Sequence, residues 1–276
     1  MNTNHIYFLL SLALYPGTFS LLTGFDPKHL PRQSDPQGHQ TGYNQCGTTA
    51  RPDSKCQNLF IYSAENFCFF APATQMPVGT AERDVVAYCS KDGYGTRLIP
   101  PNTFKSLHYI RTPHYVQITG LGDFTKVNVP PKDEGGEMDP SGADGHGNPA
   151  GGLVFGEKGQ FDRWTEFLAY DEFSLRACFN SDVAYKYCEH IYDLEGSRWN
   201  MPGDYDTPTF DQCEADDVPL PMGYYRRPDG SVYQWHRGSS PQPPPGAPGR
   251  VHRETCKTVR PPGATYSRSA RRAPPS

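Results

Sequence analysis

Eight cysteines constrain the fold of this 276-residue chain more than any other feature of its sequence. So many cysteines in a chain of this length are unusual for a cytosolic protein, and in an oxidising compartment they most simply form four disulfides. Eight cysteines allow on the order of a hundred pairings, so the sequence alone does not choose among them. Proximity along the chain predicts the pairs Cys46–Cys56, Cys68–Cys89, Cys178–Cys188 and Cys213–Cys256.

Metal binding is the other common use of cysteine. The sequence has no C-x-x-C pair, and Cys188 with His190 is an isolated couple. A structural zinc site needs four ligands, usually with such paired spacing. We therefore expect the cysteines to be crosslinks in a protein that is secreted, either extracellular or held in a cell wall.

Residues 1–20 are predicted to be a secretory signal peptide. The stretch 6–15, IYFLLSLALY, is apolar, but it is only about half as long as the roughly twenty residues that span a bilayer. The small residues Thr18 and Ser20 suit cleavage after Ser20. A buried N-terminal helix is the alternative, because no Lys or Arg precedes the apolar stretch. No other segment is long and apolar enough to span a membrane.

Residues 42–225 are predicted to form a single disulfide-linked, mainly β domain, sandwich-like rather than a barrel, after an extended arm over 21–41. Runs such as 59–72 and 115–124 are apolar, aromatic and β-branched, and they are bounded by Pro and Gly. Such runs are typical of buried strands. Residues 130–152 contain almost no apolar side chains, which predicts a long loop.

One helix is expected, from Ser181 to Leu194. Ser181 is a suitable N-cap, and Gly196 is well placed to end the helix. The apolar residues follow the spacing of a buried helical face; they are Ala184, Tyr187, Cys188 and Ile191.

The end of the chain, residues 226–276, is predicted to be a disordered Pro/Arg-rich tail. It contains ten basic and two acidic residues, a balance of +8, whereas residues 1–225 carry −12. A segment this poor in apolar residues cannot offset its chain entropy by burial. Basic tails can hold polyanions, but secretion argues against a nucleic-acid partner.

Three long strings resemble a family of secreted fungal proteins often labelled macrophage-activating glycoprotein. They occupy residues 95–129, 135–155 and 173–202, and the resemblance extends over 42–225. The label describes an effect on host cells, and the resemblance implies no enzymatic activity. The word glycoprotein transfers poorly, because this chain has no N-x-S/T sequon.

Three departures from the family pattern bear on structure. The pattern has cysteines where this chain has Ser174 and Ser197, and a histidine where it has Ser141. If residues 174 and 197 form a disulfide in the relatives, loss of that disulfide would remove both cysteines together. The resemblance therefore implies a nested pair, and it supports Cys178–Cys188 as the inner bridge.

Three kinds of site are candidates. The acidic loop offers oxygen ligands for calcium, Asp139, Asp144 and Asn148, although the spacing of an EF-hand is missing and a solvated loop is the alternative. A glycan-active hydrolase needs two facing carboxylates, for which the sequence offers Glu166, Asp171 and Glu172. Carbohydrate binding needs exposed aromatic faces, and the candidates, each of which could instead be a core residue, are Trp164, Trp199 and Tyr205.

The sequence thus favours a secreted or cell-wall-associated fungal protein of structural or interaction type, with no identified catalytic residue. A carbohydrate-binding module and a secreted glycan-active hydrolase are the alternatives. The expected partners are cell-wall polysaccharide or host immune cells, and calcium is the one cofactor considered.

Overall fold

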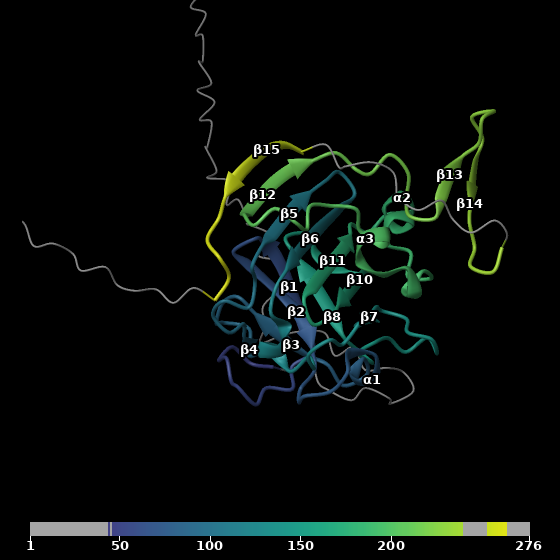
Figure 1. The fold of residues 1–276 in the computed structure, drawn as a ribbon. Coiled ribbons are helices and arrows are strands. Elements are labelled where there is room, and N and C mark those ends of the chain that lie inside the picture. Colours follow the sequence, from purple (N-terminus) through teal and green to yellow (C-terminus); the bar gives the residue numbers. More distant parts are fainter. Residues whose placement is uncertain (1–43, 45, 240–252, 264–276) are drawn as a thin grey trace, which may run out of the picture.

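The computed structural model describes residues 44, 46–239 and 253–263. Their strands form a six-stranded, a seven-stranded and a two-stranded sheet, while the helices are short and lie between the strands (Figure 1). The chain is therefore mainly β, as the sequence predicted. The predicted signal peptide and the arm over 21–41 lie outside the described residues.

The six-stranded sheet has the order β4-β3-β2-β1-β8-β9. Strands β1 and β2 are antiparallel neighbours, and β8 pairs with β1 in parallel. Nearly every residue of β2 and β3 is buried, which accounts for their continuous apolar sequence. The strands are β1 Asn58–Ser63, β2 Asn66–Ala71, β3 Val86–Cys89, β4 Arg97–Leu98, β8 Leu153–Gly156 and β9 Gly159–Phe161.

The seven-stranded sheet has the order β15-β12-β5-β6-β11-β10-β7. It is antiparallel except where β12 pairs with β5. Its strands are β5 Leu107–Arg111, β6 Tyr115–Leu121, β7 Gly136–Met138, β10 Arg163–Leu168, β11 Glu172–Cys178, β12 Phe210–Ala215 and β15 Arg253–Thr258.

Side chains of both larger sheets belong to one hydrophobic cluster. Phe69 of β2 lies 5.1 Å, between ring centroids, from Phe173 of β11. Its neighbour Phe70 lies 5.6 Å from the ring of Trp164 on β10. Burial of each such ring contributes about 1.5–3 kcal/mol, and ring pairing adds about 1 kcal/mol. The aromatic residues of the sequence thus hold the two sheets against each other.

All four predicted disulfides are present. They join Cys46–Cys56, Cys68–Cys89, Cys178–Cys188 and Cys213–Cys256. Two of them join directly opposed residues of neighbouring antiparallel strands, β2 with β3 and β12 with β15. The described residues contain no free cysteine.

The predicted helix over 181–194 is wrong in extent. Ser181 does cap a helix, since its Oγ accepts a hydrogen bond from the backbone N–H of Ala184 at 3.1 Å. That helix, α2 Asp182–Tyr185, passes into the 3-10 turn η2 Lys186–Cys188 and stops where Glu189 is extended. A second 3-10 turn, η3 Asp193–Glu195, and the helix α3 Gly196–Asn200 follow, so Gly196 caps η3 and begins α3 instead of ending one long helix.

The described parts of the predicted tail, residues 226–239 and 253–263, contain strands, while residues 240–252 and 264–276 lie outside the described residues. Strand β15 extends the seven-stranded sheet, and a hairpin of β13 Tyr224–Arg226 and β14 Val232–Gln234 projects from the rest of the molecule (Figure 1). The β structure therefore continues beyond residue 225. The disulfide to Cys213 explains why β15 is held despite its exposed, polar sequence.

The loop over 130–152 is also shorter than predicted, because β7 lies inside it and Asp139 pairs with Asn148. Two further short helices precede it, α1 Val78–Ala81 and the 3-10 turn η1 Phe124–Val127.

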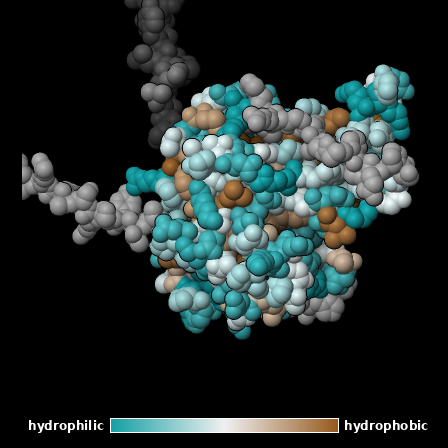
Figure 2. All heavy atoms as spheres, in the orientation of Figure 1, coloured by the Kyte–Doolittle hydropathy of each residue, from teal (hydrophilic) through white to brown (hydrophobic). Residues whose placement is uncertain are grey.

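The face seen in Figure 2 is mostly hydrophilic, with isolated hydrophobic residues. Within the described part of the chain, no helix has the length and apolarity needed to cross a membrane.

Candidate functional site

A cleft of about 720 Å³ lies where β7, the end of β10 and the segment from His190 to Ser197 meet α1. We call it the acidic cleft, because its lining includes six carboxylic acids and neither Lys nor Arg. Its size falls within the range of about 300–1,000 Å³ that is typical of ligand sites. The six acids are Glu82, Glu134, Glu137, Asp139, Glu172 and Asp193.

Glu137 of β7 and Asp139 are the most buried of the six, each with 6% of its surface exposed. Strand β7 places its side chain against Thr165 of β10, whose hydroxyl donates to Oε1 at 2.5 Å. The other oxygen, Oε2, receives no hydrogen bond from the described residues. Burial, and then the neighbouring carboxyl group of Asp193, raise the pKa of Glu137 well above its usual value.

Glu82 comes directly after α1 and lies beside β7. Its Oε1 accepts from the backbone N–H of Glu137 at 3.2 Å, and its Oε2 accepts from Nδ2 of Asn148 at 3.1 Å. Burial, together with the negative charges of Asp139 and Asp193, raises the pKa of Glu82 to about 7. This carboxyl group therefore exchanges its proton near neutral pH, which is unusual for a glutamate.

Asp139 and His190 form a hydrogen-bonded pair at one side of the cleft. Oδ1 of Asp139 accepts from the backbone N–H groups of Ser141 and Gly142, both at 2.7 Å, and lies 3.3 Å from Nδ1 of His190. On the other side of the ring, Nη1 of Arg163 lies 3.0 Å from Nε2. A guanidinium group only donates, so Nε2 is the acceptor and Nδ1 carries the proton.

Ser141 completes an Asp-His-Ser order, because its Oγ lies 3.3 Å from Nε2 of His190. A nucleophilic serine must donate its proton to that nitrogen. The lone pair of Nε2 is already directed at Arg163, which is closer. The contact therefore does not activate Ser141, and we read the three residues as supports of the loop.

The residues proposed for calcium are held together by an arginine. Arg83 donates to the carboxylate of Asp144 at 2.8 and 3.1 Å, and it lies 3.4 Å from Oδ1 of Asn148. Asp139 instead binds backbone N–H groups and His190. In the described part of the chain, no group of three or more His, Cys, Asp or Glu could hold a metal ion. The guanidinium group competes for the same oxygens, and calcium binding stays a prediction.

The acids proposed for glycan cleavage do not meet across a cleft. Glu166 is fully buried between the sheets, where both of its oxygens lie 3.0 Å from the backbone nitrogen of Phe70. Glu172 lines the acidic cleft and is paired with Arg198 at 2.7 Å. Asp171 does not line this cleft. Glu166 therefore cannot face a sugar, because no solvent reaches it.

Two of the three aromatic residues proposed for carbohydrate binding lie in the interior. Trp164 is 1% exposed and Tyr205 is 3% exposed, and the hydroxyl of Tyr205 donates to the carbonyl oxygen of Met201 at 2.9 Å. Trp199 is half-buried and packs against Tyr192 and Trp235. Only Trp199 retains part of a face that a sugar could reach.

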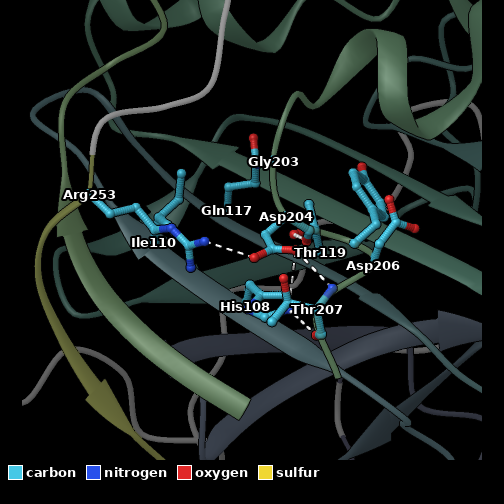
Figure 3. A pocket seen from close by; sticks show the side chains of 10 residues that line it. His108, Ile110, Gln117, Thr119, Gly203, Asp204, Asp206, Thr207 and Arg253 are labelled. Atoms are coloured by element: carbon cyan, nitrogen blue, oxygen red, sulfur yellow. Dashed lines mark hydrogen bonds and ion pairs between the residues drawn. The ribbon is translucent and has the colours of Figure 1, made fainter. Parts of the chain in front are cut away.

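A smaller pocket, of about 210 Å³, lies between β5, β6 and the start of β15 (Figure 3). Nδ1 of the buried His108 lies 3.0 Å from Oδ2 of Asp211, and Nε2 lies 3.0 Å from the carbonyl oxygen of Thr207. Both neighbours are acceptors, so both bonds form together only when the ring carries two protons. Arg253 is ion-paired with Asp204 at 2.8 Å and lies 3.4 Å from Asp211.

The carboxylates of this pocket are held by arginines, because Arg253 contacts Asp204 and Asp211 while Arg198 pairs with Asp206. We therefore interpret it as a network that fixes β15 to the sheet, and the acidic cleft as the candidate functional site. Sequence reasoning named Asp139 as a candidate ligand in the loop over 130–152, which also contains Glu137. It missed Glu82 and Asp193, which lie more than fifty residues away on either side, and no local pattern marks them.

Comparison with known proteins shows relatives in one fungus. The chain is 43% identical over 244 residues to appressorium protein ROW2 of Mycosarcoma maydis, a match that covers 84% of this chain and 82% of ROW2. It is 46% identical over 218 residues to appressorium protein ROW1 of the same fungus, which covers 76% of this chain but 50% of ROW1. No protein-family model and no solved structure matches.

These relatives confirm a fungal family, but neither carries the macrophage-activating label that the sequence suggested. The match to ROW2 spans most of both proteins, and it includes the residues that line the acidic cleft. The chain belongs to the family of fungal appressorium proteins that includes ROW1 and ROW2.

Proposed function

We propose that this chain is a secreted, cell-wall-associated protein of interaction type, which acts at the appressorium and holds a partner in the acidic cleft. In this proposal the two larger sheets form one sandwich-like domain, and the short helices and loops shape the cleft at its side. The observation that carries the proposal is the cleft itself, which is lined by six carboxyl groups, two of them buried, and by neither Lys nor Arg.

Three further observations support the proposal. Four disulfides are typical of proteins that fold in an oxidising compartment. The relatives are described as appressorium proteins. Carboxyl groups with perturbed pKa values cluster at functional sites more than elsewhere, and three of the cleft residues have raised pKa values: Glu82, Glu137 and Asp139.

The test uses the full chain with an epitope tag, expressed in a filamentous fungus. We expect the protein in the culture medium and on washed cell walls, with altered mobility on a gel after reduction. The variant Asp193→Asn should be secreted equally but retained less on the walls. The exposed control Asp53→Asn should be retained as well as the wild type. A protein found only in the cell extract would refute the proposal.

Glycan hydrolysis is the second candidate, and Glu82 is the observation that favours it. A carboxyl group with a pKa of about 7 suits a general acid, and Asp139 and Asp193 lie close enough to act on its charge. Purified protein incubated with cell-wall polysaccharides should then release reducing ends, and Glu82→Gln should release none. Equal release by Glu82→Gln and wild type would exclude this candidate.

A further inference from the structure

One of the four disulfides is open to solvent on one side. Cys256 on β15 is exposed, whereas its partner Cys213 on β12 is 1% exposed. Among the other cysteines of the described chain, Cys46 is half-buried and the rest are buried. Thiol–disulfide exchange requires a thiolate to reach a sulfur atom, so access selects the disulfide that reacts. The disulfide between β12 and β15 is therefore the one that a dissolved thiol meets first.

A second disulfide with the same arrangement is closed to solvent. Cys68 and Cys89 are also directly opposed on neighbouring antiparallel strands, β2 and β3. Both are 0% exposed, because β2 and β3 lie in the main hydrophobic cluster. The two disulfides thus share their place between paired strands and differ in exposure. That difference makes Cys68–Cys89 a control within the same molecule.

The surroundings of Cys213 and Cys256 set the direction of the reaction. Cys213 belongs to a buried hydrophobic cluster, so the accessible partner is Cys256. When Cys213 departs, its Sγ lies 3.8 Å from Oδ1 of Asp211, and a nearby carboxylate disfavours a thiolate. Nη1 of Arg253 lies 3.4 Å from the same oxygen and offsets its charge. Cys213 can therefore leave as a thiolate and take a proton from water.

Few other contacts hold β15 on the sheet. The residues from Glu254 to Thr258 are all exposed, so the strand buries little apolar surface, which is the main source of stability. The remaining contacts include the backbone pairing with β12, the ion pairs of Arg253 and the half-buried Val259 directly after the strand. Arg253 also lines the pocket that contains His108 (Figure 3). Release of β15 would therefore remove one wall of that pocket.

We propose that Cys256 is a site of thiol–disulfide exchange, at which a small thiol opens the disulfide to Cys213 and frees β15. The attacking thiolate forms a bond to Sγ of Cys256 while the bond between the two cysteine sulfurs breaks, and Cys213 leaves. A second thiol molecule then attacks this mixed disulfide and frees Cys256. Two thiols are oxidised to one disulfide, and the cysteine pair gains two electrons and two protons. This goes beyond the proposed function, because it makes one edge of the seven-stranded sheet sensitive to thiols outside the cell.

The test incubates the purified, oxidised full chain at pH 8 with dithiothreitol, or with reduced glutathione, and stops samples at intervals with an alkylating reagent. Peptide mass spectrometry then identifies the alkylated and glutathione-bearing cysteines. We expect Cys213–Cys256 to open at least about tenfold faster than Cys68–Cys89, because access controls the rate. Glutathione should be found on Cys256. Faster opening of any other disulfide, or glutathione mainly on Cys213 or on neither cysteine, would overturn the proposal.

Urea separates attack on the folded protein from attack on an unfolded one. Below the unfolding transition, the rate at Cys256 should stay within about twofold, whereas the buried disulfides should open faster as urea rises. Opening of all four disulfides together, at a rate that rises with urea, would show that only the unfolded chain reacts and would refute the proposal.

Two charge variants test whether the thiolate approaches at Cys256. Lys257 is exposed and adjacent to Cys256, so Lys257→Glu should fold normally and slow the anionic thiolate several-fold at low salt. Lys55→Glu is the matched control, because it makes the same charge change at an exposed site beside the buried Cys56. It should leave the rate at Cys256 unchanged. Equal slowing by both variants would assign the effect to overall charge and count against attack at this site.

Amide hydrogen exchange tests the release of β15. After selective opening and alkylation of Cys213 and Cys256, exchange in β15 should become at least about tenfold faster, while exchange in β6 at the centre of the sheet stays unchanged. Unchanged exchange in β15 would show that the strand stays paired without its disulfide, and the proposed release would be wrong.

Discussion

Glu166 provides a direct test of how the two sheets pack. Its carboxyl group is fully buried between them, and within the described part of the chain it accepts a hydrogen bond from the backbone N–H of Phe70 and contacts no cationic side chain. Burial raises the pKa of Glu166 well above the usual range of a glutamate. The folded protein therefore keeps this proton at pH values where the unfolded chain has released it. We expect Glu166→Gln to become more stable, relative to the wild type, as the pH rises.

Proton linkage gives the direction and the size of this change in stability with pH. Between the unfolded and the folded pKa the native state binds more protons, so wild-type stability falls by up to about 1.4 kcal/mol for each pH unit. Glutamine does not titrate, so the variant lacks this loss. Its amide oxygen still accepts from Phe70, but its NH₂ group is buried without an acceptor that serves the wild-type carboxyl group, a fixed cost of about 1–3 kcal/mol. The variant should therefore be less stable in acid and should gain on the wild type towards neutral pH.

Urea unfolding of both oxidised proteins, followed by tryptophan fluorescence between about pH 5 and pH 8, measures this difference. Glu137 and Glu82 titrate in both proteins, so their contributions cancel when the two free energies of unfolding are subtracted. Glu254→Gln, which alters an exposed carboxyl group on β15, serves as the control with no expected trend. A difference between Glu166→Gln and wild type that stays constant with pH would refute the reasoning.

Three further outcomes are expected. Replacing Cys213 and Cys256 by alanine removes a disulfide with a sequence separation of 43, which contributes about 4 kcal/mol to stability in the chain-entropy model. Amide hydrogen exchange in β15 should become faster, and unchanged exchange would contradict the role of the disulfide. Glu82→Gln should remove part of the fall in stability between about pH 5 and pH 7, because the folded wild type holds this proton up to a pKa of about 7; urea unfolding at both pH values decides this. Arg83→Met should destabilise the loop after β7 by about 1–2 kcal/mol, and limited proteolysis that is no faster there would argue against it.

The disulfides and the strand content could be predicted because they depend on local information. Each pair joins cysteines that follow one another along the chain, and Cys68 and Cys89 lie on neighbouring antiparallel strands. A short connection brings such strands together whatever the rest of the fold does. Apolar, β-branched runs likewise predict strands before the sheet is known.

The extent of the helix and the presence of strand β15 could not be predicted, because distant contacts decide both. The bridge from Cys188 to Cys178 on β11 ends the 181–188 segment in a 3-10 turn, and Ile191 is exposed although its spacing suggested burial. Strand β15 has a polar sequence that gives no strand signal. Its place is set by Cys213 and by the ion pair of Arg253 with Asp204.

The functional site was predicted only in part for the same reason. The sequence identifies the acidic loop, but it does not show that Glu82 after α1 and Asp193 in η3 approach Glu137. Glu82 and Glu137 are 55 residues apart. Conversely, the residue types of Glu166 and Trp164 suited a surface site. Both side chains are nevertheless buried, because they lie on β10 where the two sheets pack together.

The bridge between β12 and β15 also determines what a peptidase could release from this protein. Cys213 and Cys256 face each other across the two strands, so a cut at any peptide bond between them yields two fragments that remain one covalent molecule. The hairpin of β13 and β14 lies within that closed ring. A nicked form would therefore travel as an intact chain until a reductant separates its two parts.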